Sequence, residues 1–262
     1  MDRSFLSQPS VIEASRRFIC VRLATYESKE EAELLKSIFI GRSGELENTT
    51  FAILSSDGKR QLVRSGRSPS FAFGGPLNLA AAEMVSSMNR IADLYAKQSD
   101  ASADDLGLPL LKDFRLALNV ASCDNQPLIV SFADDRTQLA EINKALTPLA
   151  WSSDFIGQFQ YASVTQLDEL ESVKGLKLDA GFAVIQPDAF GVSGDVIAQV
   201  RPDATPAELK DALNLAIVFH QRHSKETSKQ IRSARQLGIE WKTQIPVTDP
   251  GRPPGRGRPP GR

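Results

Sequence analysis

Short apolar runs alternate with amphipathic stretches along both halves of the chain, a pattern typical of an α/β protein. The clearest local signal lies in residues 48–66. There, two strand candidates, Phe51–Leu54 and Gln61–Arg64, flank a polar segment that contains Asp57 and Gly58. An Asp-Gly pair between two apolar runs is a strong signal for an antiparallel hairpin. The pattern therefore predicts a hairpin with helices and strands on either side of it.

The rest of the first half is predicted to hold helices around one central strand. The run Ile19–Leu23 is nearly all apolar, which predicts a buried strand with Cys20 as a small core side chain. Residues 65–76 are rich in Gly and Pro and are predicted to form a loop, with Phe71 and Phe73 packed down onto the domain. Amphipathic patterns predict helices within residues 4–18, at 29–39 and at 77–97.

The second half repeats this alternation after a polar stretch, residues 98–105, that is predicted to be the domain boundary. Thr205, Pro206 and Glu208 form a capping-box pattern, which predicts a helix that continues to about His220. Strands are predicted at 128–132, 159–164, 182–185 and 196–200, and helices at 106–121, 136–146, 166–173, 205–220 and 224–237.

Composition places the chain among ordinary globular proteins and leaves room for two domains. It has 262 residues, of which 41% are hydrophobic and 24% charged. The net charge of −1 excludes a global attraction to nucleic acid or to a membrane surface. No apolar run approaches the roughly 18 residues of a membrane span. Motifs of serine hydrolases and zinc proteases are absent from the sequence.

Cysteine and histidine usage predicts neither a disulfide framework nor a metal centre. Cys20 and Cys123 fall in different predicted domains, and two separate thiols are the favoured interpretation. His220 and His223 lie three residues apart, so they could start a metal site on one helix face. Because no Cys and few acids are placed to complete that site, a solvated helix end is favoured, and no metal or cofactor is predicted.

The order strand–helix–strand–helix–strand–strand–helix resembles the thioredoxin-like fold. The resemblance covers residues 106–219 and extends to the first half. There, MDRSFLSQPSVIEASRRFICVRL resembles the segment that follows the active site in thioredoxin and protein-disulfide-isomerase relatives, and NTTFAILSSDGK resembles their hairpin. The resemblance implies two tandem thioredoxin-like α/β domains, each with a mixed central sheet flanked by helices. The implied divisions are 1–98, whose N-terminal strand and active-site turn are missing, 106–223, and a polar, basic end at 224–262.

The chain departs from this family at the residues that carry its chemistry. Thiol–disulfide exchange needs a CxxC pair at a helix N-terminus, where the helix dipole lowers the pKa of the first thiol. No CxxC occurs in the sequence. At the matching position of the second domain stand Ala133, Asp134, Asp135 and Arg136, which cannot exchange disulfides. The positions that match the family's cis-proline hold Thr49 and Ala180. The resemblance therefore implies a redox-inactive relative as the chain is written.

Two functional hypotheses follow. In one, the protein is a thiol–disulfide oxidoreductase whose CxxC, and an export signal with it, precede Met1. This would make it an enzyme outside the cytoplasm, whereas the chain as written predicts a cytoplasmic protein. In the other, it is a non-catalytic thioredoxin-like module that binds or scaffolds a protein partner. The incomplete first sheet could also be closed by dimerisation.

The C-terminal end is a separate feature. Residues 251–262 read GRPPGRGRPPGR and carry four Arg and no acid. This spacing would suit a basic arm on nucleic acid or another polyanion. A disordered, solubilising end is the favoured interpretation. The arginines concerned are Arg252, Arg256, Arg258 and Arg262.

Overall fold

The computed structural model divides the chain into two compact units, residues 1–99 with 242–262 and residues 100–241. Each unit is described separately below. The structure describes residues 5–6, 8–23, 25, 28–40, 44, 46, 50–67, 69–74, 80–95, 106–223 and 226–240.

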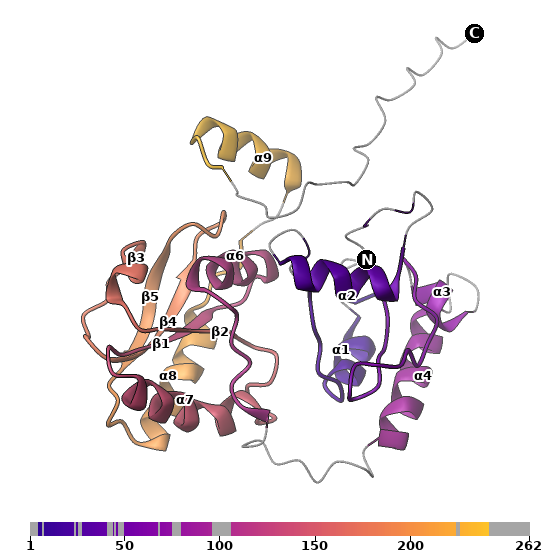
Figure 1. Ribbon diagram of the computed structural model, residues 1–262, viewed down its shortest axis with the longest axis horizontal. Helices are drawn as coiled ribbons and strands as arrows, with labels where there is room; N and C mark the ends of the chain where they lie inside the picture. Colours follow the sequence, from indigo (N-terminus) through magenta and orange to yellow (C-terminus); the bar gives the residue numbers. More distant parts are fainter. Residues whose placement is uncertain are drawn as a thin grey trace. The chain divides into compact units, whose positions relative to one another are not determined.

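The second unit is built on a five-stranded mixed sheet with the strand order β2-β1-β4-β5-β3 (Figure 1). β1 runs parallel to β2 and antiparallel to β4, β4 is antiparallel to β5, and β3 is parallel to β5. The strands are β1 (Leu128–Phe132), β2 (Gln160–Val164), β3 (Val173–Lys174), β4 (Gly181–Pro187) and β5 (Gly194–Val200). The four longer strands occupy the places that the apolar runs of the sequence predicted.

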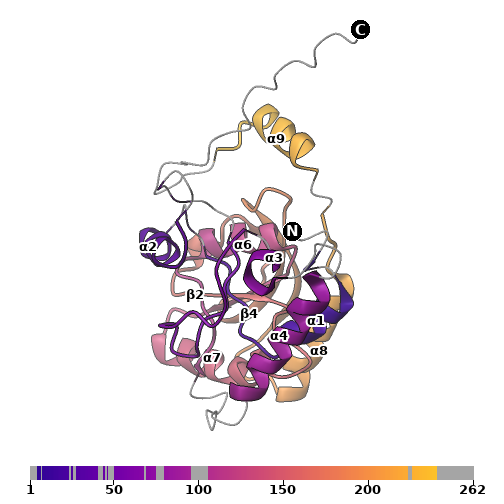
Figure 2. The same cartoon turned by 90° about the vertical axis from the view of Figure 1, so that its right-hand side faces the viewer.

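Helices cover both faces of this sheet. α7 and α8 lie on one face of the sheet, and α6 lies on the other (Figures 1 and 2). The apolar side chains of α7 and α8 form one core cluster with the sheet, and those of α6 and the 3-10 turn η1 form the other. The bounds are α6 (Phe114–Asp124), α7 (Arg136–Ala150), η1 (Leu167–Leu170), α8 (Pro206–Phe219) and α9 (Thr227–Gln236). Because both faces are covered, all five residues of β1 are buried.

α7 and α8 begin where the sequence predicted, whereas α6 begins at Phe114 instead of 106, and the helix predicted at 166–173 is only the short η1. α8 begins with the expected capping box, in which the Thr205 hydroxyl accepts from the Glu208 N–H and the Glu208 carboxylate accepts from the Thr205 N–H. α7 begins at Arg136 as expected but continues to Ala150, past the predicted end near residue 146. The apolar spacing along α8 also predicts that Ile217 faces the core, and this is wrong, because the side chain is exposed.

The apolar core on the α7–α8 face contains one polar atom without a described partner. Tyr161 lies on β2 among Phe155, Phe159 and residues of both helices, and its ring centroid is 6.4 Å from that of Phe159. Its hydroxyl is buried and has no hydrogen-bond partner among the described residues. Burial raises the pKa of Tyr161 well above its ordinary value, because the phenolate would lose its hydration.

One carboxylate organises the β4–β5 turn. Asp188 accepts hydrogen bonds from the N–H groups of Phe190 (2.8 Å), Val192 (3.2 Å) and Ser193 (3.0 Å), and from the Ser193 hydroxyl (2.6 Å). Desolvation acts to raise the pKa of Asp188, but the hydrogen bonds from Ser193 and the turn N–H groups outweigh it and lower this pKa. The turn therefore depends on an ionised carboxylate.

The first unit has helices around an irregular antiparallel ribbon. Its helices are α1 (Pro9–Ser15), α2 (Lys29–Ile38), α3 (Pro69–Phe73) and α4 (Ala80–Tyr95). The ribbon confirms the predicted hairpin pairing through antiparallel bridges between Phe51 and Gly66 and between Leu54 and Gln61. Gly58 makes the turn in the left-handed region at φ 71°. These are isolated bridges, so the described residues of the ribbon form no regular β-strand.

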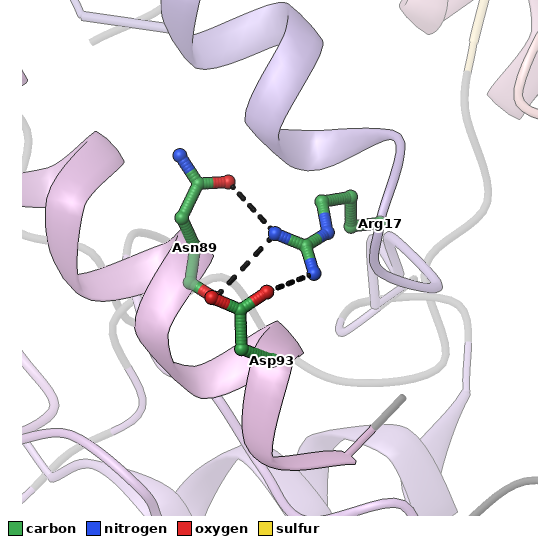
Figure 3. Close-up of polar contacts among 3 residues, drawn as sticks. All are labelled: Arg17, Asn89 and Asp93. Carbon is green, nitrogen blue, oxygen red and sulfur yellow. Dashed lines mark hydrogen bonds and ion pairs between the residues drawn. The ribbon is translucent and has the colours of Figure 1, made fainter. Parts of the chain in front are cut away.

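α1 and α4 pack together beneath this ribbon. Their contact is apolar, and it is closed at the end of α1 by Arg17 (Figure 3). The Arg17 guanidinium donates to the Asp93 carboxylate at 2.6 Å and to the Asn89 side-chain oxygen at 3.2 Å. Since both partners lie on α4, Arg17 fixes the end of α1 against that helix. The buried members of the contact are Val11, Ala14, Ile53, Met84, Met88 and Ile91.

Two predictions for the first unit are wrong. Residues 19–23 form no strand, and Cys20 is exposed rather than part of a core. The stretch is apolar, but no neighbouring strand is described for it to pair with, so the sequence pattern alone was misleading. Part of the predicted loop at 65–76 forms α3 instead. From this helix Phe73 packs on Phe51 at a ring distance of 5.6 Å, whereas Phe71 is exposed.

Candidate binding site

The residues that the family resemblance singles out lie between the end of β1 and the start of α7. Ala133 is buried, and its N–H donates to the Val164 carbonyl at 3.4 Å. Asp135 is the N-cap of α7, and its side chain accepts from the Thr137 N–H at 2.8 Å. This cap agrees with the predicted helix start at residue 136. Asp134 and Arg136 are exposed, so this turn presents charged side chains to solvent directly ahead of a helix.

The register of the sheet brings Ala180 to the same place. Phe132, the last residue of β1, pairs with Gly181, the first residue of the antiparallel β4. The residues just beyond that pair, Ala133 and Ala180, therefore lie next to each other where β1 ends and β4 begins, at one end of these two central strands. Ala133 and Ala180, which are 47 residues apart in the sequence, are thus neighbours in the structure. The other position matched to the cis-proline, Thr49, lies outside the described residues.

Gly181 is the tightest point of this edge. Its φ is 136°, and a Cβ atom there would stand 2.1 Å from the carbonyl oxygen of Val200 on the neighbouring strand. Only glycine fits this close approach of β4 to β5. The backbone that carries Ala180 is therefore held by packing against β5. No sequence pattern indicated this requirement, although a glycine directly before an apolar run could have suggested it.

The chemistry available at this edge is electrostatic. The described residues here offer no thiol, and Asp134 has no ion-pair partner among them. Asp135 already occupies the positive N-terminus of α7, which leaves that helix end unsuited to a further anion. Two neighbouring carboxylates instead favour a cationic group. The described residues of this turn therefore suit a positively charged group.

Three polar side chains form a closed hydrogen-bonded ring next to the turn between β1 and α7. The sequence analysis missed this ring. The fully buried Ser131 donates to the side-chain oxygen of Asn143 at 2.5 Å, and its oxygen is 2.6 Å from the Ser163 hydroxyl. The Asn143 amide donates to Ser163 at 3.0 Å. These bonds join β1, β2 and α7, so the ring fixes the helix that carries Asp135. A serine inside the apolar run 128–132 was the available signal.

The two histidines hold the far end of α8 by hydrogen bonds to backbone carbonyls. His220 Nε2 bonds the Asn125 carbonyl at 2.9 Å, and His223 Nε2 bonds the Pro187 carbonyl at 2.8 Å. Burial lowers the pKa of His220, and the nearby charges of Arg222 and His223 act in the same direction. The expected helix end is confirmed, but both imidazoles are half-buried rather than solvated. Across the part of the chain that the structure describes, no group of three His, Cys, Asp or Glu is placed to hold a metal ion.

Neither thiol belongs to this turn, because Cys123 lies on α6 and Cys20 belongs to the first unit. Cys123, an exposed residue of α6, lines a cavity of about 270 Å³ together with Phe190 and Ile231. The Cys20 sulfur is 3.7 Å from the Ser15 carbonyl oxygen, and partial burial raises the pKa of its thiol. A raised pKa leaves less thiolate at neutral pH, which makes Cys20 a poor nucleophile.

The chain matches no family model, no curated protein and no solved structure. None of the helices that the structure describes has both the length and the apolar character needed to cross a bilayer. The four tail arginines, Arg252, Arg256, Arg258 and Arg262, and residues 1–4 lie outside the described part of the chain. Polyanion binding through the tail therefore stays a prediction, as does an active-site segment ahead of Met1.

Proposed function

We propose that the second unit is a thioredoxin-like module that binds a protein partner and performs no thiol chemistry. The observation that carries the proposal is the pairing of Phe132 with Gly181. Through it, the turn with Asp134 and Asp135 and the half-buried Ala180 lie at the same end of the two central strands β1 and β4. In the family that the sequence resembles, the matching edge holds the substrate polypeptide, so loss of the thiols would leave the binding surface without its reaction.

The connectivity of the second unit supports this proposal. A parallel β1–α7–β2 unit is followed by the antiparallel pair β4–β5 and then by α8. The sequence resemblance implies the same order. For residues 1–98 the tandem assignment stays a prediction, so the proposed function rests on the second unit alone.

The partner chemistry follows from the charges at the edge. An extended segment that carries Lys or Arg would place its cation beside Asp134 and Asp135 while its backbone passes the ends of β1 and β4. Exposed ion pairs contribute about 0.2–1 kcal/mol each, so charge would tune the affinity while backbone and apolar contacts supply most of it. We expect weak binding that falls as salt concentration rises.

Fluorescence anisotropy with labelled ten-residue peptides tests the binding part. The peptides share one uncharged scaffold and differ in carrying two Lys, two Glu or no charge. We expect the Lys peptide to bind best, and we expect Asp134→Lys to weaken that binding roughly tenfold. Glu141→Lys, an equal charge change on an exposed residue further along α7, should leave the affinity nearly unchanged. Equal affinity for all three peptides, or equal loss in both variants, would refute the proposed site.

An insulin-reduction assay tests the absence of thiol chemistry. The full chain should reduce insulin no faster than its Cys20→Ser/Cys123→Ser variant, because the chain has no CxxC pair and neither thiol belongs to the turn between β1 and α7. Faster reduction by the unmodified chain would show a redox function and contradict the proposal.

A further inference from the structure

We propose that residues 220–223 form a pH-sensitive clasp, which holds α9 on the second unit at neutral pH and releases it in mildly acidic solution. The inference goes beyond the proposed function, because it concerns the other end of the central strands. β4 begins with Gly181, next to the turn between β1 and α7, and ends with Pro187. The clasp bonds to Pro187 and to Asn125, which lies just ahead of β1. Opening it would therefore leave the candidate binding site in place.

Two amide side chains hold the backbone of the clasp by reciprocal hydrogen bonds. The Asn125 amide donates to the His223 carbonyl at 3.2 Å, and the Asn125 side-chain oxygen accepts from the His223 N–H at 3.1 Å. Gln186 bonds Gln221 in the same way, donating at 3.0 Å and accepting at 2.8 Å. Each pair of bonds resembles the two-bond contact between antiparallel strands. The clasp is thereby fixed both to the end of α6 and to the end of β4.

The two imidazoles close the clasp through their Nε2 atoms. His220 Nε2 lies 2.9 Å from the Asn125 carbonyl oxygen, and His223 Nε2 lies 2.8 Å from that of Pro187. Because a carbonyl oxygen can only accept, each Nε2 must carry a proton, and the neutral ring then has none on Nδ1. The Nδ1 atom of His220 is buried and has no hydrogen-bond partner among the described residues.

A second proton on His220 destabilises the closed clasp. It would have to lie on Nδ1, where a cationic N–H would be buried without an acceptor. Burial accordingly lowers the pKa of His220; the hydrogen bond to Asn125 acts to raise it, and the charges of Arg222 and His223 act to lower it. In the opened clasp the ring meets water and titrates near the ordinary pKa of about 6.5. Opening therefore takes up a proton and becomes more favourable as the pH falls below about 6.5.

The carboxylates next to the clasp bond to other groups. Asp124, at the end of α6, accepts from an amide side chain of β2 at 3.3 Å. Asp188, directly after β4, accepts from N–H groups of its own turn. The charges that act on the His220 ring are those of Arg222 and His223. Both are positive when protonated, so both oppose a charge on His220.

α9 has little else to hold it in place. The Gln230 amide donates to the Ala189 carbonyl at 2.5 Å. Beside this bond lies a cavity of about 270 Å³ between α9, α6 and the turn after β4. A void of this size means that the helix makes few packing contacts there. Opening of the clasp would therefore free a helix whose charged side chains are all basic, namely Lys229, Arg232 and Arg235.

Hydrogen exchange of the full chain, followed by mass spectrometry at about pH 7.5 and about pH 5.5, tests the proposal. After correction for the intrinsic pH dependence of exchange, peptides from residues 220–236 should lose protection roughly three- to tenfold at the lower pH. A peptide that covers β1 should keep its protection, because β1 is fully buried and lies outside the clasp. The β1 peptide thus separates opening of the clasp from unfolding of the whole unit.

His220→Gln removes the titration and keeps the donor. Its amide can still donate to the Asn125 carbonyl but cannot take up a proton, so the corrected protection of residues 220–236 should not change with pH. His223→Gln is the matched control, since it also removes one imidazole. The buried nitrogen without a partner belongs to His220, so this control should still lose protection at the lower pH.

Equal protection of residues 220–236 at both pH values in the unmodified chain would overturn the proposal. A loss of the same size in His220→Gln would overturn it as well. If His220→Gln is open at both pH values, NMR titration of the unmodified chain decides, because the chain has only two histidines and their signals can be assigned. The midpoint of opening should then coincide with the titration of His220, and a different midpoint would refute the clasp.

Discussion

Replacing Tyr161 by Phe is expected to stabilise the second unit. The Tyr161 hydroxyl is buried and has no partner among the described residues. A buried polar group without a hydrogen bond costs about 1–3 kcal/mol, because its bonds to water are lost on folding and not replaced. Phe keeps the ring, and with it the packing against Phe159. The free energy of unfolding should therefore rise by about 1–2 kcal/mol.

Urea unfolding followed by tryptophan fluorescence is suited to this measurement. Trp151 is the tryptophan among the residues that the structure describes, and it lies in the second unit. Trp151 packs against the same apolar cluster as Tyr161. The midpoint should shift to higher urea while the slope with urea stays constant, because the surface exposed on unfolding hardly changes.

Ser131→Ala is the matched control, since it also removes one buried hydroxyl. The Ser131 hydroxyl bonds Asn143 and Ser163. Its loss should lower the free energy of unfolding by about 1–2 kcal/mol and leave those partners incompletely bonded. Opposite signs for the two variants would support the reasoning. A Tyr161→Phe variant destabilised by more than about 0.5 kcal/mol would refute it, because the hydroxyl would then make a net favourable hydrogen bond.

Two further predictions concern the strand edge and the β4–β5 turn. Gly181→Ala should destabilise the second unit by about 2–4 kcal/mol in the same urea assay, because the new Cβ meets the Val200 carbonyl. Gly157→Ala, at φ 72° with open space around it, should cost only about 1–2 kcal/mol, and equal losses would contradict the steric cause. Asp188→Asn should destabilise at pH 7 by about 1–3 kcal/mol, since hydrogen bonds to a charged acceptor are lost. The pKa of Asp188 is lowered in the folded protein. Its contribution to stability is therefore fully present above the unfolded-state pKa of about 3.9 and is lost as the pH falls through the folded-state pKa. Between pH 7 and pH 3 the free energy of unfolding should consequently fall less in Asp188→Asn than in the unmodified protein.

The sequence by itself determined the elements whose signals are local. The apolar run at 128–132 fixed β1 to the residue, and the cap residues Asp135 and Thr205 fixed where α7 and α8 begin. Asp57-Gly58 fixed the pairing of the first-unit ribbon. Each of these signals works through bonds within a few residues, so no distant partner is needed to interpret it. The absence of a CxxC from the printed sequence was equally visible without the structure.

Only the tertiary structure decided which distant residues meet. The pairing of Phe132 with Gly181 brings Ala133 and Ala180 together, and the steric demand on Gly181 comes from a carbonyl on another strand. The failed prediction for Cys20 has the same cause. An apolar run is a buried strand only when other strands pair with it, and no such partner is described for residues 19–23. Likewise, the pattern of α8 showed which residues are apolar, but the sheet decided which apolar face is buried and which is left exposed, because a helix with two apolar faces can bury only one against a single layer.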